Sequence, residues 1–475
     1  MMEELAGKGI RLTLEAEDIL EAKKSDELLK KIIDLEKPLI SKEDLESLLE
    51  EPEAKLEVAR TADFLPIAKD YSADLKVNHT YDVTGKSRTR GGVENFISHF
   101  RNRFERLGRL LRRSGSTPHA DLGDIKRHLN EKVRVIVIIS ARRETKKGNL
   151  LFEVEDMTGT FKVVVSSSKY SEKLLDKGKS VILDDVVAIT GKVLEPYIIA
   201  EDIEWPELPV IREKKLSEND LAAVYLSDLH FGSKQFLGHY LKAFTDWLHG
   251  KGAAKELAGK VKYISIAGDI VDGIGIYPNQ EKDLVVKDIY SQYTMFNDFI
   301  ENLPDYIEVI VAPGNHDAVR RGEPQPALGK DLVSADITSV GNPSSVTIEG
   351  IKHLIYHGTS IDSMISSIPN LSYMHPERVM VEYLKRRHLS PIYGGNLMIP
   401  EDIDYMVIEE PPDIFHTGHV HKNGYTQYRG TLVINSGTFQ DRTDYQVKQG
   451  HVPTPGMVPV YELKHGRLRT LDFKS

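Results

Sequence analysis

The sequence predicts a multidomain α/β (α+β) chain, in which a small helical module and a five-stranded barrel precede a larger α/β domain. Three observations predict it. The chain has 475 residues, and at about 150 residues per domain it has room for about three domains. Five short segments of strand type follow one another between residues 133 and 205. Beyond residue 220, several apolar segments end in His, Asp or Asn.

The overall composition is that of a folded, water-soluble protein. Hydrophobic residues make up 40% and charged residues 28%, which excludes collagen-like, coiled-coil and wholly disordered chains. The longest apolar runs, such as residues 135–139, fall far short of the ~20 residues that a membrane helix needs. Residues 1–18 lack the features of a secretory signal. We therefore expect a cytoplasmic protein without a membrane partner.

The sequence contains no cysteine. This excludes disulfides, cysteine zinc modules, iron–sulfur clusters and thiol nucleophiles. A metal site would have to use His, Asp, Glu or Asn, and 17 histidines are available for one. Ligands of these types favour harder divalent ions over those that prefer thiolates.

The N-terminal part of the chain divides by charge. Residues 1–75 contain 11 Lys and Arg against 20 Asp and Glu, whereas residues 76–115 contain 10 against 3. Residues 1–75 predict a small acidic helical module, with a capping box at residues 41–44 followed by leucines at helical spacing. Residues 76–93 are rich in Gly, Thr, Ser and basic residues, which predicts a flexible basic linker.

Residues 94–205 are predicted to contain a basic helix and the barrel. Apolar side chains recur at helical spacing in the first part: Phe96, Phe100, Phe104, Leu107 and Leu111. The arginines around this stripe include Arg101, Arg103 and Arg109. Two interpretations stay open. The stripe packs on the next domain and the arginines form a solvated face, or the arginines lie along a DNA backbone.

The barrel is predicted from the order of its strands. The strand-type segments cover residues 133–140, 149–156, 160–166, 180–193 and 196–205, with a helical segment at residues 171–178. Five short strands with a helix between the third and the fourth is the order of an OB-fold barrel. Such barrels often bind single-stranded nucleic acid through stacked aromatic side chains, but the candidate faces here offer few aromatics. Nucleic-acid binding and a structural or partner-docking role both stay open.

Residues 220–470 are predicted to form an α/β domain with a metal site. Polar residues of metal-ligand type follow its apolar strand-like segments: Asp228 and His230, Asp269, Asn315 and His316, His357, and His419 and His421. In α/β folds the carboxyl ends of neighbouring strands open into one crevice, so these side chains should converge. Carboxylates, imidazoles and an amide oxygen suit two divalent cations that share a bridging carboxylate. Asp272 could orient a ligand, and His353 and His416 are interpreted as core residues.

This ordered set resembles the ligand pattern of the calcineurin-like metallophosphoesterases, and every position of that pattern is filled. Residues 268–280, 288–293 and 435–446, together with the preceding barrel, add a resemblance to the small subunits of archaeal DNA polymerase D. Those subunits are related to the B-subunits of eukaryotic replicative polymerases. The resemblance covers about residues 95–470. It implies a β-sandwich with flanking helices for residues 220–470.

The ligands that the resemblance implies fall into two groups joined by a shared carboxylate: Asp228, His230 and His421 for one ion, Asn315, His357 and His419 for the other, and Asp269 for both. His316 would stand beside the substrate phosphate and protonate the leaving oxygen or stabilise its charge. Its partner would be Asp317 or another nearby acid. Manganese is the usual ion of the family, and Fe, Zn and Ni also suit these ligands.

The resemblance also implies a function and a partner. The chain would be a 3′→5′ exonuclease that proofreads single-stranded or primer 3′ ends of DNA, bound to a large catalytic polymerase subunit at the nucleoid. A catalytically silent scaffold for that subunit is the alternative, which the intact ligand set disfavours. A free-standing phosphatase is a third hypothesis, for which the helical module, basic helix and barrel would be superfluous.

Overall fold

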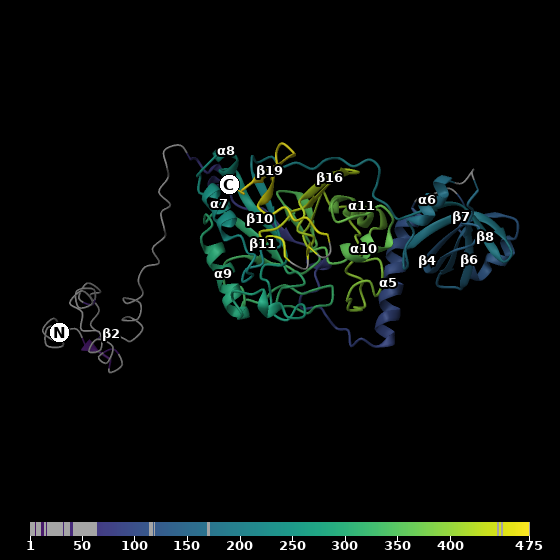
Figure 1. Cartoon of the computed structure of the whole chain (residues 1–475), viewed down its shortest axis with the longest axis horizontal. Helices are drawn as coiled ribbons and strands as arrows, with labels where there is room; N and C mark the ends of the chain where they lie inside the picture. Colours follow the sequence, from purple (N-terminus) through teal and green to yellow (C-terminus); the bar gives the residue numbers. More distant parts are fainter. Residues whose placement is uncertain are drawn as a thin grey trace. The chain divides into compact units, whose positions relative to one another are not determined.

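The computed structural model describes residues 5, 11–13, 16, 32, 39–40, 64–113, 117, 119–168, 172–443, 446–447 and 450–474 (Figure 1). The chain divides into two compact units, residues 1–60 and residues 61–475. In the first, β1 (Arg11–Leu12) pairs in parallel with β2 (Leu39–Ile40). The capping box expected at residues 41–44 lies outside the described residues, so the helical module stays a prediction.

A closed five-stranded barrel lies between residues 132 and 204. Its strands are β4 (Lys132–Glu144), β5 (Leu150–Glu155), β6 (Thr160–Val165), β7 (Val186–Leu194) and β8 (Tyr197–Glu204). They close in the order β4-β5-β6-β8-β7 around buried apolar side chains such as Val135, Phe152 and Ile189. The 3-10 helix η3 (Leu122–His128) buries Leu122 and Ile125 in the same core. Helix α6 (Glu172–Lys179) lies between the third and fourth strands, where the sequence predicts one.

Helix α5 (Val93–Arg112) carries the predicted apolar stripe. Phe104, Leu107 and Leu111 are buried in one cluster with side chains of β4 and β7. Phe96 and Phe100 make edge contacts with Tyr393 of the large domain, each with ring centroids 5.5 Å apart. The prediction that this stripe packs on a neighbouring domain is therefore confirmed.

The arginines of α5 do not share one environment. Arg103 is 1% exposed, and its Nε donates to Asp404 Oδ2 at 2.7 Å. Arg106 is also buried and donates to the main-chain oxygen of Asp404. The expectation that Arg103 contacts nucleic acid is wrong, because its guanidinium is buried against a carboxylate. Arg101 and Arg109 are exposed.

The segment predicted as a flexible linker, residues 76–93, is bound to the large domain. Strand β3 (Leu75–Val77) pairs antiparallel with β13 (Ser344–Ile348), between the 3-10 helices η1 (Ile67–Asp70) and η2 (His79–Tyr81). Further along, Asp82 Oδ2 accepts from the Gly341 N–H at 2.8 Å, and Glu401 Oε2 accepts from the Arg88 N–H at 3.2 Å. The linker prediction is corrected, because strand pairing and these hydrogen bonds attach the segment to the large domain.

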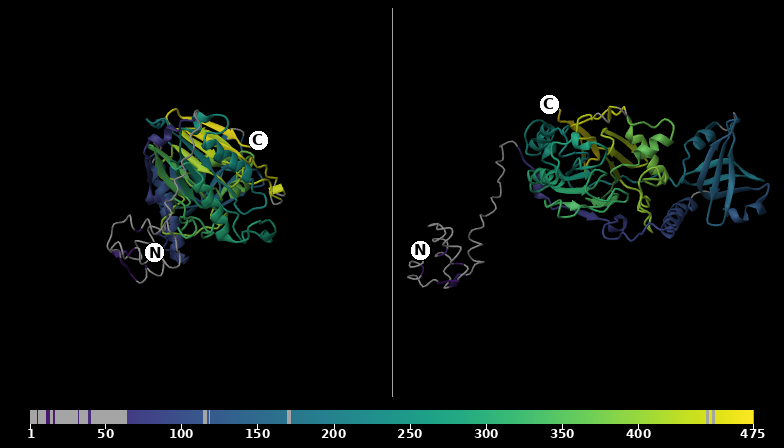
Figure 2. Two further views of the ribbon diagram at one scale, coloured as in Figure 1. Left: turned by 90° about the vertical axis from the view of Figure 1, so that its left-hand side faces the viewer. Right: turned by 60° about the horizontal axis from the view of Figure 1, so that its bottom comes forward.

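The large domain is a sandwich of two six-stranded sheets (Figure 2). The first has the order β12-β11-β10-β9-β18-β19 and comprises β9 (Ala222–Leu226), β10 (Val261–Ala267), β11 (Glu308–Ala312), β12 (Thr338–Ser339), β18 (Met457–Glu462) and β19 (Arg467–Asp472). The second has the order β16-β17-β15-β14-β13-β3 and adds β14 (Ile351–Ile355), β15 (Ile414–Thr417), β16 (Gly424–Tyr428) and β17 (Thr431–Asn435). β9, β10 and β11 run parallel, and so do β14, β15 and β17.

Helices cover the outer faces of both sheets. The first sheet packs against α7 (Gly238–Leu248), α8 (Lys255–Ala258) and α9 (Ile289–Glu301), and the second against α10 (Ile361–Ser367) and α11 (Pro376–Arg386) (Figure 1). Tyr225, Ile310 and Ile434 lie in the core between the sheets. Strands β9 and β10 are buried on both faces, which explains their continuous apolar sequences. Within the described residues, no helix is long and apolar enough to cross a membrane.

Candidate metal centre

The predicted ligands follow the carboxyl ends of parallel strands in both sheets. In the first sheet, β9 ends at Leu226 before Asp228 and His230, and β10 ends at Ala267 before Asp269. In the second, β15 ends at Thr417 before the segment with His419 and His421. Because these strand ends meet at one edge of the sandwich, the structure brings together all seven residues predicted as ligands: Asp228, His230, Asp269, Asn315, His357, His419 and His421. We call this group the crevice.

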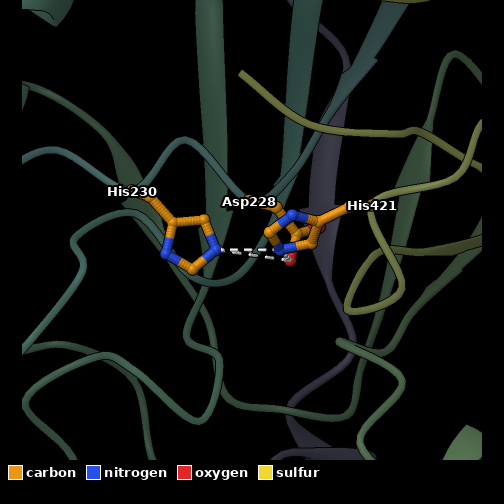
Figure 3. A group of neighbouring side chains, drawn as sticks. All are labelled: Asp228, His230 and His421. Atoms are coloured by element: carbon orange, nitrogen blue, oxygen red, sulfur yellow. Dashed lines mark hydrogen bonds and ion pairs between the residues drawn. The ribbon is translucent and has the colours of Figure 1, made fainter. Parts of the chain in front are cut away.

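One half of the crevice is formed by Asp228, His230 and His421, which point toward one another in Figure 3. The Nε2 atoms of His230 and His421 are 3.0 Å apart. Asp228 Oδ1 lies 3.4 Å from His421 Nε2 and 4.0 Å from His230 Nε2. Three potential ligand atoms therefore face one small volume.

The other half is formed by Asp269, Asn315, His357 and His419. Asn315 Oδ1 lies 3.0 Å from His357 Nε2 and 3.1 Å from His419 Nδ1. Asp269 Oδ2 lies 3.3 Å from His357 Nε2 and 3.9 Å from His230 Nε2 of the first half. Asp269 is thus the carboxylate that lies between the two halves, as the bridging role would require.

Contacts behind the rings decide which nitrogen faces the crevice. His357 Nδ1 lies 2.8 Å from the Ala267 carbonyl oxygen, and His230 Nδ1 lies 3.1 Å from Asp272 Oδ1. Since those oxygens only accept, each Nδ1 carries the hydrogen, and in the neutral ring the lone pair of Nε2 points into the crevice. Lone pairs of nitrogen and oxygen repel one another at such distances unless a cation or a proton lies between them. The donor set therefore fits divalent cations, with outer hydrogen bonds of the kind that orient metal-bound histidines.

The buried carboxylates of the crevice also stabilise a positive charge beside them. Burial alone would raise the pKa of Asp269, but His357 and His316 outweigh burial and hold that pKa well below its ordinary value. Burial would lower the pKa of His357, but Asp269 and Asp228 raise it to about 10. Buried carboxylates thus hold a proton on an imidazole, and a metal ion would take the place of that proton.

The backbone at the crevice is bent into an unusual conformation. Several predicted ligands have positive φ angles: Asp228 (51°), His230 (52°), Asp269 (52°), His419 (73°) and His421 (56°). Non-glycine residues rarely adopt this region, and such strain concentrates at functional sites. The glycines beside the ligands leave no room for a side chain. A Cβ at Gly314 would lie 2.2 Å from Asp269 Oδ1, and a Cβ at Gly418 would lie 2.4 Å from Asp228 Oδ2.

His316, the predicted proton donor, lies at the part-exposed side of the crevice. Its main-chain N–H donates to Asp269 Oδ1 at 2.8 Å, and its Nδ1 lies 2.7 Å from the Asp272 carbonyl oxygen. The expected acidic partner Asp317 is corrected: its carboxylate instead accepts from the Gly314 N–H at 2.8 Å and from the Tyr293 hydroxyl at 3.2 Å. Burial, and then the charge of Asp269, raise the pKa of Asp317 to about 7.

Several residues that support the crevice were not predicted. Gln446 Nε2 lies 2.8 Å from His421 Nδ1, and Asp362 Oδ2 lies 3.1 Å from His419 Nε2. Gln280 and Gln440 both donate to the carboxylate of Asp272. The signal for the glutamines was present, because all three fall in the segments 268–280 and 435–446 that carry the finer family resemblance. Asp362 had no such signal.

The residues interpreted as supporting or core residues lie where that interpretation puts them. Asp272 holds His230. His416 lies between Ser265 and Ser436 in the core, with hydrogen bonds of 3.1 and 3.0 Å. His353 is buried with its Nε2 2.9 Å from the Tyr225 hydroxyl.

Comparison with known proteins agrees with this geometry. Residues 223–423 match the calcineurin-like phosphoesterase family. Over 391 residues the chain is 44% identical to the DNA polymerase II small subunit of Archaeoglobus fulgidus, covering 80% of this chain and 77% of that one. The chain belongs to the archaeal DNA polymerase II small-subunit family.

Other members of the small-subunit family give the same result. The relative from Methanocaldococcus jannaschii is 39% identical over 411 residues, covering 84% of this chain and 68% of that one. The relative from Methanothermobacter thermautotrophicus is 37% identical over 428 residues, covering 87% and 86%. The resemblance inferred from the ordered motifs is therefore confirmed, and the calcineurin-like match supports binding of divalent metal by this family member.

Proposed function

We propose that this small subunit is a metal-dependent 3′→5′ exodeoxyribonuclease that hydrolyses DNA phosphodiesters with two divalent ions. Mn²⁺ is the favoured ion at both positions. The observation that carries the proposal is the convergence of seven ligand-type side chains at one edge of the sandwich. The proposed ligands of one ion are Asp228, His230 and His421, those of the other are Asn315, His357 and His419, and Asp269 belongs to both.

The chemistry divides between the ions and the side chains. Two bound divalent ions would polarise the phosphate oxygens and lower the pKa of water at the site. His316 Nδ1 is engaged by the Asp272 carbonyl, so Nε2 is the atom left to give a proton to the departing 3′-oxygen. Burial lowers the pKa of His316, against the attraction of Asp269, so the protonated ring is a stronger acid and gives up its proton readily. No side chain is required as a nucleophile.

The proposed partner is a large catalytic polymerase subunit. The support is the name of the relatives, which are small subunits of a DNA polymerase. The sequence has no polymerase motif of its own, so we infer that nucleotide addition belongs to the other chain. The barrel, which we assign to the OB type from its strand order, and the large domain are the proposed docking surfaces, and the exposed Arg101 and Arg109 are proposed DNA contacts. Extension of a primer by this chain alone would contradict the division of labour.

Replacement of His316 and of Asn315 by Ala tests the nuclease. With 5′-labelled single-stranded DNA and Mn²⁺, the wild type should shorten the strand from its 3′ end. His316→Ala should lower kcat by about 10²–10⁴-fold, because general acid catalysis contributes that much. Asn315→Ala should also weaken metal binding. His128→Ala, at a half-buried histidine of η3 outside the crevice, is the matched control.

Two outcomes would reject the nuclease. Undiminished digestion by both crevice variants would show that the site is assigned wrongly. A wild-type chain that hydrolyses nothing with any divalent ion, yet still co-purifies with a large polymerase subunit, would establish the scaffold alternative.

A further inference from the structure

A loop of residues 273–277 borders the proposed proton donor. It begins directly after Asp272, whose carbonyl oxygen lies 2.7 Å from His316 Nδ1. Gly273 has a φ of 73°, and a Cβ there would lie 2.3 Å from the His316 carbonyl oxygen. The loop therefore packs directly on the main chain of His316, at the side where the crevice is part-exposed.

Hydrogen bonds from outside hold this loop in one conformation. Gln292 Oε1 accepts from the Gly273 N–H at 2.9 Å, and Gln280 Oε1 accepts from the Ile276 N–H at 2.9 Å. The Tyr277 hydroxyl donates to Asp283 Oδ2 at 3.1 Å, next to the 3-10 helix η5 (Gln280–Lys282). Despite this fixation, Ile274 is 47% exposed. A fixed loop with an exposed apolar side chain is a preorganised contact surface.

Arg321 joins this loop from the segment that follows His316. Its Nη2 donates to the Gly275 carbonyl oxygen, and within the described part of the chain it forms no ion pair. The neighbouring Arg320 differs, because it is paired with Glu401 Oε1 at 3.0 Å and donates to the Pro324 carbonyl oxygen. A guanidinium has five N–H groups, so Arg321 keeps most of its donors for another group.

The negative charges of the crevice give a reason for a cation near its opening, because an anionic substrate must approach them. Asp228, Asp269 and Asp272 are buried carboxylates that repel an anionic substrate until metal ions neutralise them. Arg321 is the exposed positive charge that the chain attaches to the loop beside His316. Arginine binds phosphate oxygens with two parallel N–H groups.

We propose that residues 273–277 and Arg321 form a binding site for the DNA strand, with Arg321 bound to the phosphate next to the scissile one and Ile274 packed on the adjoining sugar and base. This inference rests on the proposed nuclease function and names how that site selects a polynucleotide. A small phosphodiester has no neighbouring phosphate and therefore does not contact Arg321.

The test compares Arg321→Ala and Arg321→Lys in the full chain on two substrates, labelled single-stranded DNA and bis(p-nitrophenyl) phosphate. For Arg321→Ala we expect KM for DNA to rise about 10-fold, as for one lost charged contact, with kcat and hydrolysis of the small ester unchanged. The slope of binding affinity against salt should flatten by about 0.7. Arg321→Lys should restore part of the affinity, since it keeps the charge.

Two further variants complete the test. Ile274→Glu, which adds a negative charge on the same loop, should weaken DNA binding while it leaves the small ester unaffected. Arg467→Ala is the matched control. In the sheet Arg467 lies opposite Glu462, and Glu462 lies opposite Ala222 at the start of β9, so Arg467 is at the edge of the sheet away from the crevice.

The outcomes separate this inference from the proposed function. An unchanged KM for DNA in Arg321→Ala, or an equal loss on both substrates, would overturn the inference, since the second result means that Arg321 only supports the loop. If the wild type hydrolyses neither substrate, the nuclease proposal fails. Binding of labelled DNA measured by anisotropy, with its salt slope, then still decides the role of Arg321.

Discussion

Two clusters of the molecule bury histidines beside aspartates, but the negative charge of the aspartates is balanced differently in each. The first is the crevice, where Asp269 lies 3.3 Å from His357 and 3.9 Å from His230. The second we call the junction: it comprises His99, Arg103, His388 and Asp404, where α5 meets the large domain. Asp404 Oδ2 there accepts from Arg103 Nε at 2.7 Å and lies 2.9 Å from His388 Nε2.

The junction supplies its own cation, whereas the crevice does not. Arg103 cannot lose its proton under ordinary conditions, so His388 can stay neutral: burial and then Arg103 lower its pKa to about 4. The crevice has no arginine or lysine among its ligand-type residues, and His357 retains a proton instead. The comparison teaches that histidines and aspartates alone do not identify a metal site. What matters is whether the protein itself provides the positive charge.

Removal of the shared carboxylate should have the largest effect. Asp269→Ala should lower exonuclease activity by about 10⁴-fold, about 5 kcal/mol of activation free energy, because both proposed ions lose a ligand. Isothermal titration with Mn²⁺ should show a reduced stoichiometry. Chelation of metal from the wild type should abolish activity equally, and readdition of Mn²⁺ should restore it in the wild type alone. Activity that survives chelation would remove the distinction between the two clusters.

Removal of the junction cation should lower stability and not catalysis. Arg103→Met leaves the Asp404 carboxylate buried without its cation, so the free energy of unfolding should fall by about 3–5 kcal/mol. Arg101→Met, on the same helix but exposed, should change it by less than about 0.5 kcal/mol. Urea unfolding of both variants checks this. A loss of nuclease activity in folded Arg103→Met would show that the junction takes part in catalysis.

Acid should weaken the junction through His388. Its pKa in the folded state is about 4 against an ordinary value of about 6.5, so between these pH values the unfolded chain takes up a proton that the folded chain refuses. Stability should therefore fall as pH falls through this window, by about 1.4 kcal/mol per pH unit for this group, and level off below pH 4.

His388→Gln should show a shallower pH dependence than the wild type in urea unfolding at about pH 7 and about pH 5.5. His353, also buried with its pKa lowered to about 4, is present in both proteins and cancels in the comparison. Equal slopes in the two proteins would mean that His388 is not held neutral.

The smallest effect is expected at the exposed arginines of α5. If Arg101 and Arg109 contact DNA, replacement of both by Ala should weaken binding only a few-fold, because Arg109 also lies 3.7 Å from Glu409. The salt slope should flatten by up to about 0.7 for each phosphate contact that is lost. An unchanged slope would restrict DNA contacts to the crevice and its surroundings.

The crevice could be predicted more fully than the helix that joins the domains. Asp228, His357 and His421 each follow an apolar strand, and parallel strands bring such positions to one edge whatever the intervening loops do. Periodicity on α5 identified Phe104 and Leu107 as buried. It could not identify the buried arginines, Arg103 and Arg106, because the barrel and the large domain flank the helix and a helical period describes only one apolar face.

The supporting contacts were predicted least well. Asp362 contacts His419, which lies 57 residues away along the chain. The partner of His316 is Asp272 and not Asp317, and the contact is to the main-chain oxygen of Asp272, which a pattern of side chains cannot predict. The sequence of the polar segment before residue 93 predicts a linker because its hydrogen-bond partners are distant along the chain: Asp82 and Gly341 are 259 residues apart, and Arg88 and Glu401 are 313 residues apart.

By itself, the sequence determined the five strands of the barrel with the helix between the third and the fourth, the ligand-type residues at the strand ends and the family, because these follow from local periodicity and from motifs in a fixed order. The tertiary structure alone decided that Arg103 closes the junction, that the segment before α5 completes a sheet and that Arg321 lies over the loop beside His316. The physical reason is that these features are contacts between segments far apart along the chain. Such contacts depend on how the sheets and helices pack, and no local pattern encodes them.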